Sequence, residues 1–410
     1  MRGQWMAPMA LACLLALPAC SQPVRHAAVP PKQEARAVPI GLADVRYVVG
    51  NEADMARLSR DVADTWVRER AWRKQQGLTG ALPPSNLLAL SGGGDKGAFG
   101  AGLLNGWTQT GTRPEFLLVT GISTGALIAP FAFLGPAYDT RLKALYTTTS
   151  SKDLIEVRNL LAALSSDALA DTAPLRRLLK KHIDRAFLDA VAAEYDKGRE
   201  LWVSTTNLDA RQRVIWNLTR LAKSRDPRAL SLFHDIMIAS ASIPVEFPPV
   251  MIDVSVDGKP YQEMHVDGGA MAQVFVYPPS IDLERLSEER GGMRKRTLYV
   301  VMNARLDPDW ADTERKMLPI ASRAISSMIH TQGVGDLYRI YATSQRDAVD
   351  FNLAYIPASF EYPHNEEFDA DFMQALYQTG YRMAMQGYPW ETVPPGFVVH
   401  ESGHAAARKP

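Results

Sequence analysis

The hydrophobic pattern of the chain changes character near residue 85. After this point, short apolar runs alternate with longer stretches in which apolar residues recur at helical spacing. The short runs predict strands at residues 87–90, 116–120, 201–205, 213–217, 251–256, 298–302 and 349–356. The longer stretches predict helices at residues 98–109, 124–133, 174–194, 232–239, 318–346 and 369–386. This alternation indicates an α/β fold in which helices cover a largely parallel sheet.

The first twenty residues carry a different pattern. Arg2 is followed by an apolar stretch, Met6–Leu17, which is interrupted by Pro8 and is too short to span a bilayer. This pattern predicts a targeting segment that is not part of the fold. The stretch ends in Leu17-Pro18-Ala19-Cys20, which resembles the lipobox of bacterial lipoprotein signal peptides.

The lipobox resemblance implies that residues 1–19 are removed and that Cys20 is lipidated as the mature N-terminus. With Ser21 beside it, the resemblance also implies an exported protein that is anchored in the outer membrane of a Gram-negative bacterium. The alternative is an ordinary secretory signal that is cleaved near Ala19. The lipoprotein is favoured because no other cysteine follows Cys20 in the chain.

Composition divides the rest of the chain into four parts. Residues 20–45 are rich in proline and predict a disordered tether. Residues 46–84 predict a helical extension, with an amphipathic helix between residues 51 and 76. Residues 85–395 hold the strand and helix alternation and predict the main domain. Residues 396–410 predict a polar C-terminal tail.

A glycine-rich segment, Ser91–Gly97, lies between a predicted strand and a predicted helix. Successive glycines let several backbone N–H groups point one way, and the following helix adds its own unpaired N–H groups. The segment therefore predicts an anion site, either for a phosphate or for the oxyanion of an acyl-transfer intermediate.

Two nucleotide-binding motifs are close to this segment. Gly92, Gly94 and Gly97 satisfy G-x-G-x-x-G, but the next predicted strand does not end in the acidic residue that the dinucleotide motif needs. Lys96 is followed by glycine and not by serine or threonine, which excludes a P-loop. Neither nucleotide motif is therefore supported.

A second motif, Gly121-Ile122-Ser123-Thr124-Gly125, also joins a predicted strand to a predicted helix. It has the G-x-S-x-G pattern of a nucleophile elbow, in which a sharp turn makes the serine hydroxyl accessible. Ser123 is therefore the candidate nucleophile, and Gly121 and Gly125 support its turn. The alternative is a tight strand-to-helix turn with a solvated serine.

A third segment, His265-Val266-Asp267-Gly268-Gly269, offers a base for the serine, whose hydroxyl is a poor nucleophile by itself. On a strand, His265 and Asp267 face the same side, so a Ser–His–Asp triad is conceivable. A triad needs the histidine between the other two residues, whereas neighbours on one strand stand side by side. We therefore expect His265 to be structural or to line the cleft.

The three motifs occur in an order that resembles the patatin-like phospholipases. The connecting segments 205–209 and 239–249 resemble that family as well. The resemblance covers residues 87–273 and continues more loosely through residues 368–387. It implies the patatin-like three-layer α/β/α sandwich with a central, largely parallel sheet.

The resemblance also implies a mechanism, because the family uses a serine and an aspartate without a histidine. Carried over, it makes Ser123 the nucleophile and Asp267 its only base, and it implies an acyl-enzyme intermediate. The implied substrate is a lipid or another carboxylic ester, without a metal or cofactor. The resemblance assigns the oxyanion hole to Gly92, Gly93 and Gly94. It gives supporting roles to Lys96, Gly97, Gly121, Gly125, Gly268 and Gly269.

Charge and cysteine content exclude further classes of partner and site. Forty-five Lys and Arg balance forty-five Asp and Glu. No strong positive field is present, so we expect no nucleic-acid partner. Both cysteines, Cys13 and Cys20, lie in the targeting segment or at its end. The main domain therefore cannot contain a disulfide, a cysteine-ligated zinc or a catalytic thiol.

Two alternative functions remain open. One is an α/β-hydrolase whose triad uses a histidine, for which the late candidates are His330, His364, His400 and His404. The other is a catalytically silent lipoprotein that binds lipid or scaffolds a partner.

The predicted helix near residues 174–195 has one apolar face and several basic residues on its other faces. Such a helix more often packs on its own core, and contact with a phospholipid surface is the alternative.

Overall fold

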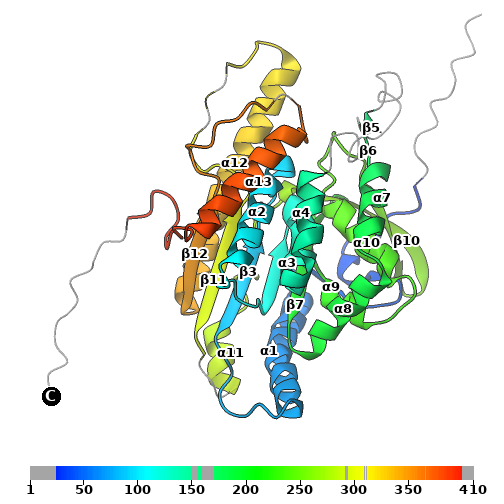
Figure 1. Cartoon of the computed structure of the whole chain (residues 1–410). Helices are drawn as coiled ribbons and strands as arrows, with labels where there is room; N and C mark the ends of the chain where they lie inside the picture. Colours follow the sequence, from blue (N-terminus) through cyan, green and yellow to red (C-terminus); the bar gives the residue numbers. More distant parts are fainter. Residues whose placement is uncertain are drawn as a thin grey trace, which may run out of the picture.

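The computed structural model describes residues 25–148, 156–157, 168, 170–290, 294–308, 310, 312–364 and 366–398. The predicted targeting segment, Cys20 and most of the predicted tail lie outside these residues. Figure 1 shows a central sheet with helices on both of its faces. The predicted three-layer α/β/α sandwich is confirmed.

One sheet of ten strands runs through the described domain, and its main path has the order β1-β9-β10-β7-β4-β3-β11-β12. Strand β8 pairs with β7 and with β2 outside this path. The neighbours from β7 to β12 are parallel, and all other pairs in the sheet are antiparallel. The strands of the sheet are β1 (Val38–Pro39), β2 (Arg46–Val48), β3 (Ser85–Leu90), β4 (Leu118–Gly121), β7 (Glu200–Asn207), β8 (Gln212–Asn217), β9 (Val250–Val256), β10 (Lys259–Asp267), β11 (Arg296–Met302) and β12 (Val349–Tyr355). A separate pair consists of β5 (Glu156–Val157) and β6 (Ala170–Asp171).

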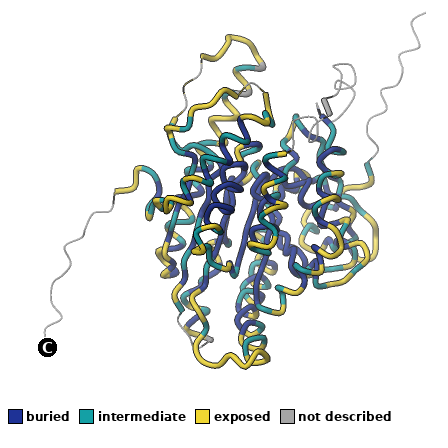
Figure 2. The backbone as a smooth tube through the Cα atoms, in the orientation of Figure 1, coloured by how far each residue is buried: buried dark blue, intermediate teal, exposed yellow. Residues whose placement is uncertain are grey.

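Two helical layers cover the sheet, and alternate strand residues point into one or the other. On β3, Leu88 and Leu90 belong to one buried cluster, whereas Leu87 and Ala89 belong to the second. Figure 2 shows the sheet as the buried centre of the molecule. The helices over the first cluster are α2 (Gly97–Gln109), α3 (Thr124–Leu134), α4 (Asp139–Thr147), α7 (Ala173–His182), α8 (Arg185–Asp196), α9 (Leu218–Lys223), α10 (Ala229–Ser240) and α13 (Ala370–Met385). Those over the second cluster are α1 (Glu52–Gln75), α11 (Leu283–Arg290) and α12 (Met317–Arg346). Short 3-10 turns are η1 (Glu34–Arg36), η2 (Gly94–Lys96), η3 (Pro136–Tyr138) and η4 (Gly268–Ala270).

The structure differs from the predicted tether over residues 20–45. Its described part, residues 25–45, packs on the domain, with β1 paired to β9 and Ala28 bridged to Gln262. Val29, Ala37 and Val45 are buried. Proline-rich composition therefore does not indicate disorder here, because a few apolar residues and open strand edges hold the segment in place.

Other elements also differ from the sequence prediction, among them one helix and one strand. The helix predicted at 174–194 is two helices, because Asp184 begins α8 by accepting a hydrogen bond from the Phe187 N–H at 2.8 Å. Strand β10 was not predicted, since its polar residues hide the apolar pattern. One of these residues, Glu263, is buried and forms an ion pair with Arg46 of β2.

Helices α2 and α13 touch through glycines. A Cβ on Gly102 would lie 2.0 Å from the Tyr377 carbonyl oxygen, and one on Gly380 would lie 2.3 Å from the Phe99 carbonyl oxygen. No side chain fits at either contact, so the two backbones can approach only because both residues are glycine. This contact holds α13 against the helix that begins at the glycine-rich segment.

We predict that Gly102→Val destabilises the protein by about 3 kcal/mol or more, because the new side chain would overlap a backbone carbonyl. Urea unfolding should show a lower midpoint. Gly335→Ala is the matched control, since its Cβ meets nothing closer than 4.0 Å. That control should leave the midpoint unchanged or raise it slightly. Equal midpoints for Gly102→Val and wild type would contradict the close contact.

Candidate active site

The site is organised by one edge of β7. Strand β4 runs parallel to β7 and pairs Gly121 with Val203, whereas β10 runs antiparallel and pairs Asp267 with Thr205. Both lie on the same edge, because β8 occupies the other one. The carboxyl ends of β4 and β10 therefore approach each other head to head. Ser123, two residues beyond β4, is brought to Asp267 at the end of β10.

Ser123 occupies a strained turn between β4 and α3. Its φ is 54° and its ψ is −127°, an uncommon conformation for a residue with a side chain. Its N–H donates to the Ser240 hydroxyl at 3.0 Å, and that hydroxyl donates to the Ser204 carbonyl at 2.8 Å. The turn has the geometry that the G-x-S-x-G pattern predicts. Ser240 holds it in place, and sequence reasoning did not single out this residue.

Asp267 is a buried carboxyl with few partners. One carboxylate oxygen accepts a hydrogen bond from the Gly269 N–H at 2.6 Å. Burial raises the pKa of Asp267 to about 7, while hydrogen bonds from the Ser123 side chain and the Gly269 N–H act to lower it. A carboxyl with a pKa near neutrality is a stronger base than an ordinary aspartate, and it lies beside the serine.

The glycine-rich segment lies directly against Ser123. A Cβ on Gly92 would be 3.2 Å from the Ser123 Cβ. The Gly92 N–H donates to the Gln273 carbonyl at 2.9 Å, so it cannot bind a second acceptor while that bond is intact. The N–H groups of Gly93 and Gly94 have no acceptor among the described residues. Of the three glycines assigned to the oxyanion hole, Gly93 and Gly94 therefore offer donors and Gly92 does not.

Asn303 holds this segment in position. It follows β11, which pairs with β3 and so ends beside the glycines. Its N–H donates to the Ser91 hydroxyl at 2.8 Å, and its side-chain amide donates to the Ser91 carbonyl at 2.9 Å. Its amide oxygen accepts from the Gly100 N–H at 3.1 Å. A Cβ on Gly93 would lie 2.1 Å from the Asn303 carbonyl oxygen, so only glycine fits there.

Lys96 does not have the supporting side-chain role that was expected. Its side chain is exposed and forms no hydrogen bond or ion pair with the described residues. Only its N–H contributes, by donating to the Gly93 carbonyl at 3.1 Å. Asn303 was missed by sequence reasoning, although a polar residue at the carboxyl end of a parallel strand is a signal that could have found it.

Gln273 joins the parts of the site. Its side-chain amide donates to the Gly269 carbonyl at 2.8 Å, and its carbonyl accepts from Gly92. Its N–H donates to the Asp336 carboxylate of α12 at 2.6 Å. One residue thus connects the Asp-Gly-Gly turn, the glycine-rich segment and a helix of the outer layer. Nothing in its sequence context marked it.

His265 is structural. Along β7 it pairs with Asn207, beyond the Asp267 pair, so Asp267 lies between His265 and Ser123. Its Nδ1 is 2.8 Å from the Thr205 hydroxyl, and its Nε2 is 3.1 Å from the Glu263 carboxylate. Burial lowers the pKa of His265. A triad through His265 would need the histidine in the middle, so this geometry rules it out.

The late histidines do not supply a triad either, so far as the structure describes them. His364 bonds to Asp95 at 2.7 Å, on the turn after the glycines, and His330 lies on α12. His400 and His404 fall outside the described residues.

A second carboxyl of the site belongs to Glu246. Burial raises its pKa to about 7, and the charges of Glu367 and Asp267 add to this rise. One of its carboxylate oxygens is buried and has no hydrogen-bond partner among the described residues. Glu246 and Asp267 therefore influence each other's ionisation.

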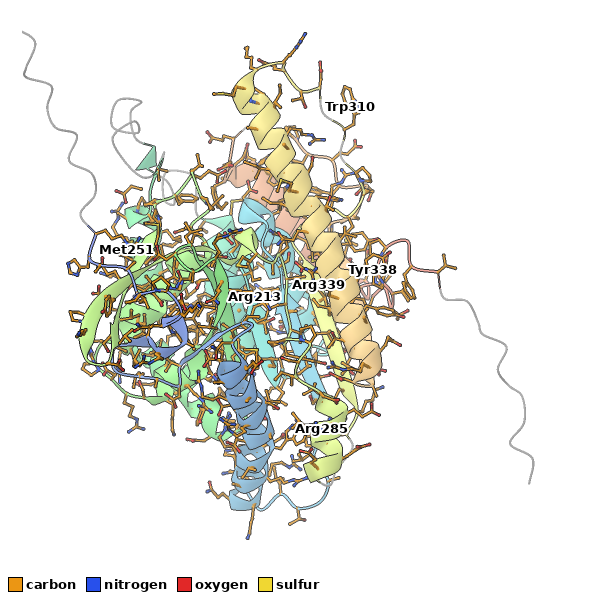
Figure 3. The ribbon with its side chains drawn as sticks, turned by 180° about the vertical axis from the view of Figure 1, so that it is seen from behind. Arg213, Met251, Arg285, Trp310, Tyr338 and Arg339 are labelled. Atoms are coloured by element: carbon orange, nitrogen blue, oxygen red, sulfur yellow. The ribbon has the colours of Figure 1, made fainter. Side chains whose placement is uncertain are left out.

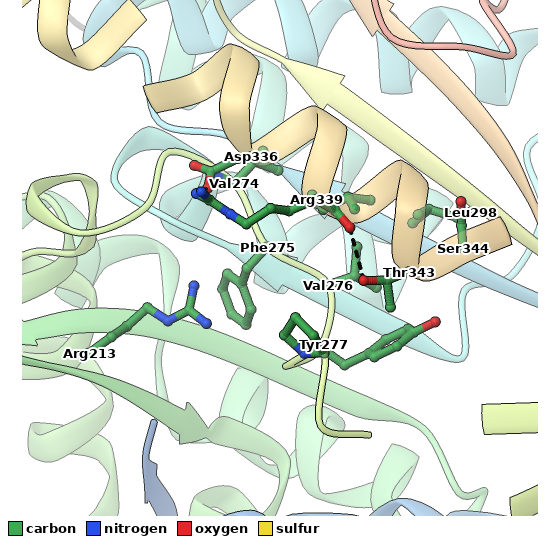
Figure 4. A pocket seen from close by; sticks show the side chains of 12 residues that line it. Arg213, Val274, Phe275, Val276, Tyr277, Leu298, Asp336, Arg339, Thr343 and Ser344 are labelled. Carbon is green, nitrogen blue, oxygen red and sulfur yellow. Dashed lines mark hydrogen bonds and ion pairs between the residues drawn. The ribbon is translucent and has the colours of Figure 1, made fainter. Parts of the chain in front are cut away.

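A cavity of about 70 Å³ is lined in part by Val274–Tyr277, in the segment that follows Asp267. Figure 4 shows the side chains that line it. The Arg213 guanidinium faces it, with its central carbon 5.5 Å from the centre of the Phe275 ring. Burial lowers the pKa of Arg213, whereas the Asp336 charge opposes this. The lining includes neither Ser123 nor Asp267, and a volume of this size holds a few water molecules only. It is not the place where an ester meets the serine.

Within the described residues, no group of three or more His, Cys, Asp or Glu side chains is arranged to hold a metal ion. No described helix combines the length and the apolar character that crossing a bilayer requires.

The known structures that are similar to the chain include the following three, each at low identity and low TM-score. VipD from Legionella pneumophila has 13% identity and a TM-score of 0.35, covering 75% of this chain and 67% of its own. Full-length ExoU from Pseudomonas aeruginosa, in complex with SpcU, has 13% identity and a TM-score of 0.31, with 75% and 52% covered. Human GIVD cytosolic phospholipase A2 has 12% identity and a TM-score of 0.28, with 69% and 51% covered. The chain thus spans about half the length of the last two.

The sequence comparison identifies one domain family. No curated protein is similar enough to match the chain. Residues 88–278 match the family model of the patatin-like phospholipases, and they include the glycine-rich segment, Ser123 and Asp267. The chain therefore carries a patatin-like phospholipase domain over these residues.

Proposed function

We propose that the chain is a serine lipid acyl hydrolase of the phospholipase A or esterase type, with Ser123 and Asp267 as a catalytic dyad. One observation carries this proposal. The strained Ser123 turn and the buried Asp267 meet at one edge of β7, beside two backbone N–H groups that have no acceptor in the part of the chain that the structure describes. The family match supports a lipid ester as the substrate class.

In the first half of the proposed reaction, the Ser123 hydroxyl oxygen attacks the ester carbonyl carbon while Asp267 accepts the hydroxyl proton. The N–H groups of Gly93 and Gly94 stabilise the resulting oxyanion. Collapse of this intermediate breaks the ester bond, and Asp267 returns its proton to the leaving alcohol. The acyl group stays on Ser123 as an ester.

In the second half, water attacks the acyl-enzyme and Asp267 accepts a proton from it. A second oxyanion forms at the same N–H groups. Its collapse releases the carboxylic acid, and the proton on Asp267 returns to the Ser123 oxygen. The enzyme is restored, and one ester and one water become one acid and one alcohol.

We predict that Ser123→Ala and Asp267→Asn each lower kcat/KM for p-nitrophenyl butyrate by about a thousandfold or more. Ser123→Ala should also lose labelling by a fluorophosphonate probe. His265→Gln is the matched control, because an amide can replace one acceptor and one donor in the buried network around His265. This control should keep most of the activity.

Two results would reject the dyad. One is a histidine variant, at position 265, 330 or 364, that is folded and as inactive as Ser123→Ala. The other is a folded wild type that neither hydrolyses esters nor takes the probe, while it binds phospholipid. The second result would favour a lipid-binding protein over an enzyme.

The pKa of Asp267 predicts the pH dependence of the reaction. Only the ionised carboxylate can accept the serine proton, so kcat/KM should fall about tenfold per pH unit below about 7 and level off above it. Removing the nearby negative charge should lower the pKa of Asp267, so Glu246→Gln should move the inflection to lower pH. A flat profile between pH 5 and 8 would exclude Asp267 as the base.

We also propose that the chain is an exported lipoprotein that Cys20 anchors in the outer membrane. The basis is the Leu17-Pro18-Ala19-Cys20 segment at the end of an apolar stretch. In a Gram-negative host, the chain should incorporate a clickable fatty acid and fractionate with outer membranes. Cys20→Ser should abolish both, whereas Cys13→Ser should abolish neither. An unlabelled product that is cleaved near Ala19 would identify an ordinary secretory signal.

A further inference from the structure

Helix α12 has two halves with opposite surroundings. In the second half, Leu337 and Ser344 are buried against the sheet. In the first half, every side chain from Ala324 to Ile329 is exposed, so that part of the helix is surrounded by solvent. Figures 1 and 2 show this end of α12 extending beyond the rest of the domain, with its surface exposed.

The exposed side chains of this half are large and apolar. Met317 is 81% exposed, Met328 is 71% exposed, and Trp310 in the preceding segment is 89% exposed. Ile320, Ile325 and Ile329 are exposed as well. Figure 3 shows Trp310 close to the projecting end of α12. A set of this size is unusual on the surface of a monomeric protein and marks a site of interaction.

The projecting half is amphipathic. At about 3.6 residues per turn, Met317, Ala321, Ala324 and Met328 fall along one line of the helix, with Ile320 and Ile325 on its two sides. The opposite side carries Arg323, Ser326 and His330. This is the pattern of helices that lie in the plane of a membrane interface, with basic residues on the polar side.

The projecting half starts at the active site. A Cβ on Gly333 would lie 3.3 Å from the Met302 side chain and 3.6 Å from that of Gln273, the residue that joins the parts of the site. One turn later, Asp336 binds the Gln273 N–H. Residues 317–332 therefore extend about 24 Å outward from the site at 1.5 Å per residue.

Its charge fits a phospholipid surface. No acidic residue occurs from 317 to 335, where Arg323 is the one Lys or Arg. Directly before the helix, Asp312 and Glu314 balance Arg315 and Lys316, and Lys316 pairs with Glu314 at 2.6 Å. An apolar helix side without acidic residues gains free energy when it enters the acyl boundary of a bilayer. Isolated helices of this length are marginal in water, so a partner that covers the apolar side would also stabilise the helix.

The basic helix expected near residues 174–195 does not offer the same contact. In α7, Leu175 and Leu179 are buried in the domain, so the apolar side of that helix is already covered. Arg176 is paired with Asp235 at 2.6 Å. Of α7 and α12, only α12 has an exposed apolar side.

We propose that residues 317–332 of α12, with Trp310, dock on the surface of a phospholipid bilayer and hold the Ser123 site at the lipid. This inference rests on the proposed lipid hydrolase function for its purpose. The docking itself rests on the exposure, pattern and charge of the helix. Val245 and Met271 are exposed apolar residues as well, and Met271 follows Asp267 by four residues.

The first test places a dye at one position of the full chain. Cys13 and Cys20 are the only cysteines, so a Cys13→Ser, Cys20→Ser background allows single labelling and also removes the proposed lipid anchor. An environment-sensitive dye on Met328→Cys should shift to the blue, with a roughly twofold gain in emission, on phosphatidylcholine vesicles that contain phosphatidylglycerol. Brominated lipids should quench it. Arg285→Cys, on the opposite end of the molecule in Figure 3, is the control and should not respond.

Three results would overturn the docking. The dye at 328 could stay unchanged on vesicles, or both positions could respond equally. A blue shift that depends on protein concentration without vesicles would identify a second copy of the chain as the partner.

The second test separates docking from chemistry in the same background. Ile320→Gln, Ile325→Gln and Met328→Gln together keep good helix formers and remove the apolar side. Hydrolysis of vesicle phospholipid should fall about tenfold or more, while hydrolysis of p-nitrophenyl butyrate stays within about twofold. Val67→Gln with Leu78→Gln, which replaces exposed apolar residues elsewhere, is the matched control and should change neither.

Equal loss of both activities in the α12 variant would show that the helix supports the site and not the lipid contact. A parent protein that hydrolyses neither substrate would remove the proposed function. In that case, the dye at 328 still decides whether α12 meets the bilayer.

Discussion

The site depends on two strands that share one edge of β7. Since β4 is parallel and β10 is antiparallel to β7, their carboxyl ends must meet, and each end carries a residue of the proposed dyad. A sheet built only from parallel strands would bring both ends to the same rim as neighbours, not facing each other. The change from parallel to antiparallel pairing at β7 therefore places Ser123 against Asp267. It also places His265 on the far side of Asp267.

This arrangement has a cost in stability that other contacts offset. Burial raises the pKa of Asp267, so the folded state binds a proton that the unfolded chain releases between about pH 4 and pH 7. Stability therefore falls as pH rises through this range and stays lower above it. Ser123 adds strain through its positive φ. Hydrogen bonds from Gln273 to Gly269, from Asn303 to Ser91 and from Ser123 to Ser240 stabilise the turns of the site.

Sequence analysis found the residues that belong to short motifs. It missed the residues whose role depends on contacts between segments far apart in the chain. Ser123 and the glycines were found because a sharp turn needs glycine and serine at fixed spacing. Asn303 and Gln273 act through contacts between segments far apart in the chain, which no local pattern records. Strand β10 was missed because its ion pair with Arg46 allows a charged residue in the core. Residues 25–45 were assigned to a tether because proline content does not reveal open strand edges.

Helix α12 is hydrogen-bonded to the candidate active site, and its first half projects into solvent. Asp336 binds the Gln273 N–H, and Gln273 in turn bonds to the Asp-Gly-Gly turn and accepts a bond from Gly92. The helix that carries the exposed apolar side is thus bonded, through one residue, to both halves of the proposed catalytic centre. Docking of its projecting half would order a helix that has little internal support. The bonds through Asp336 and Gln273 would then hold the serine at a fixed depth below the lipid surface.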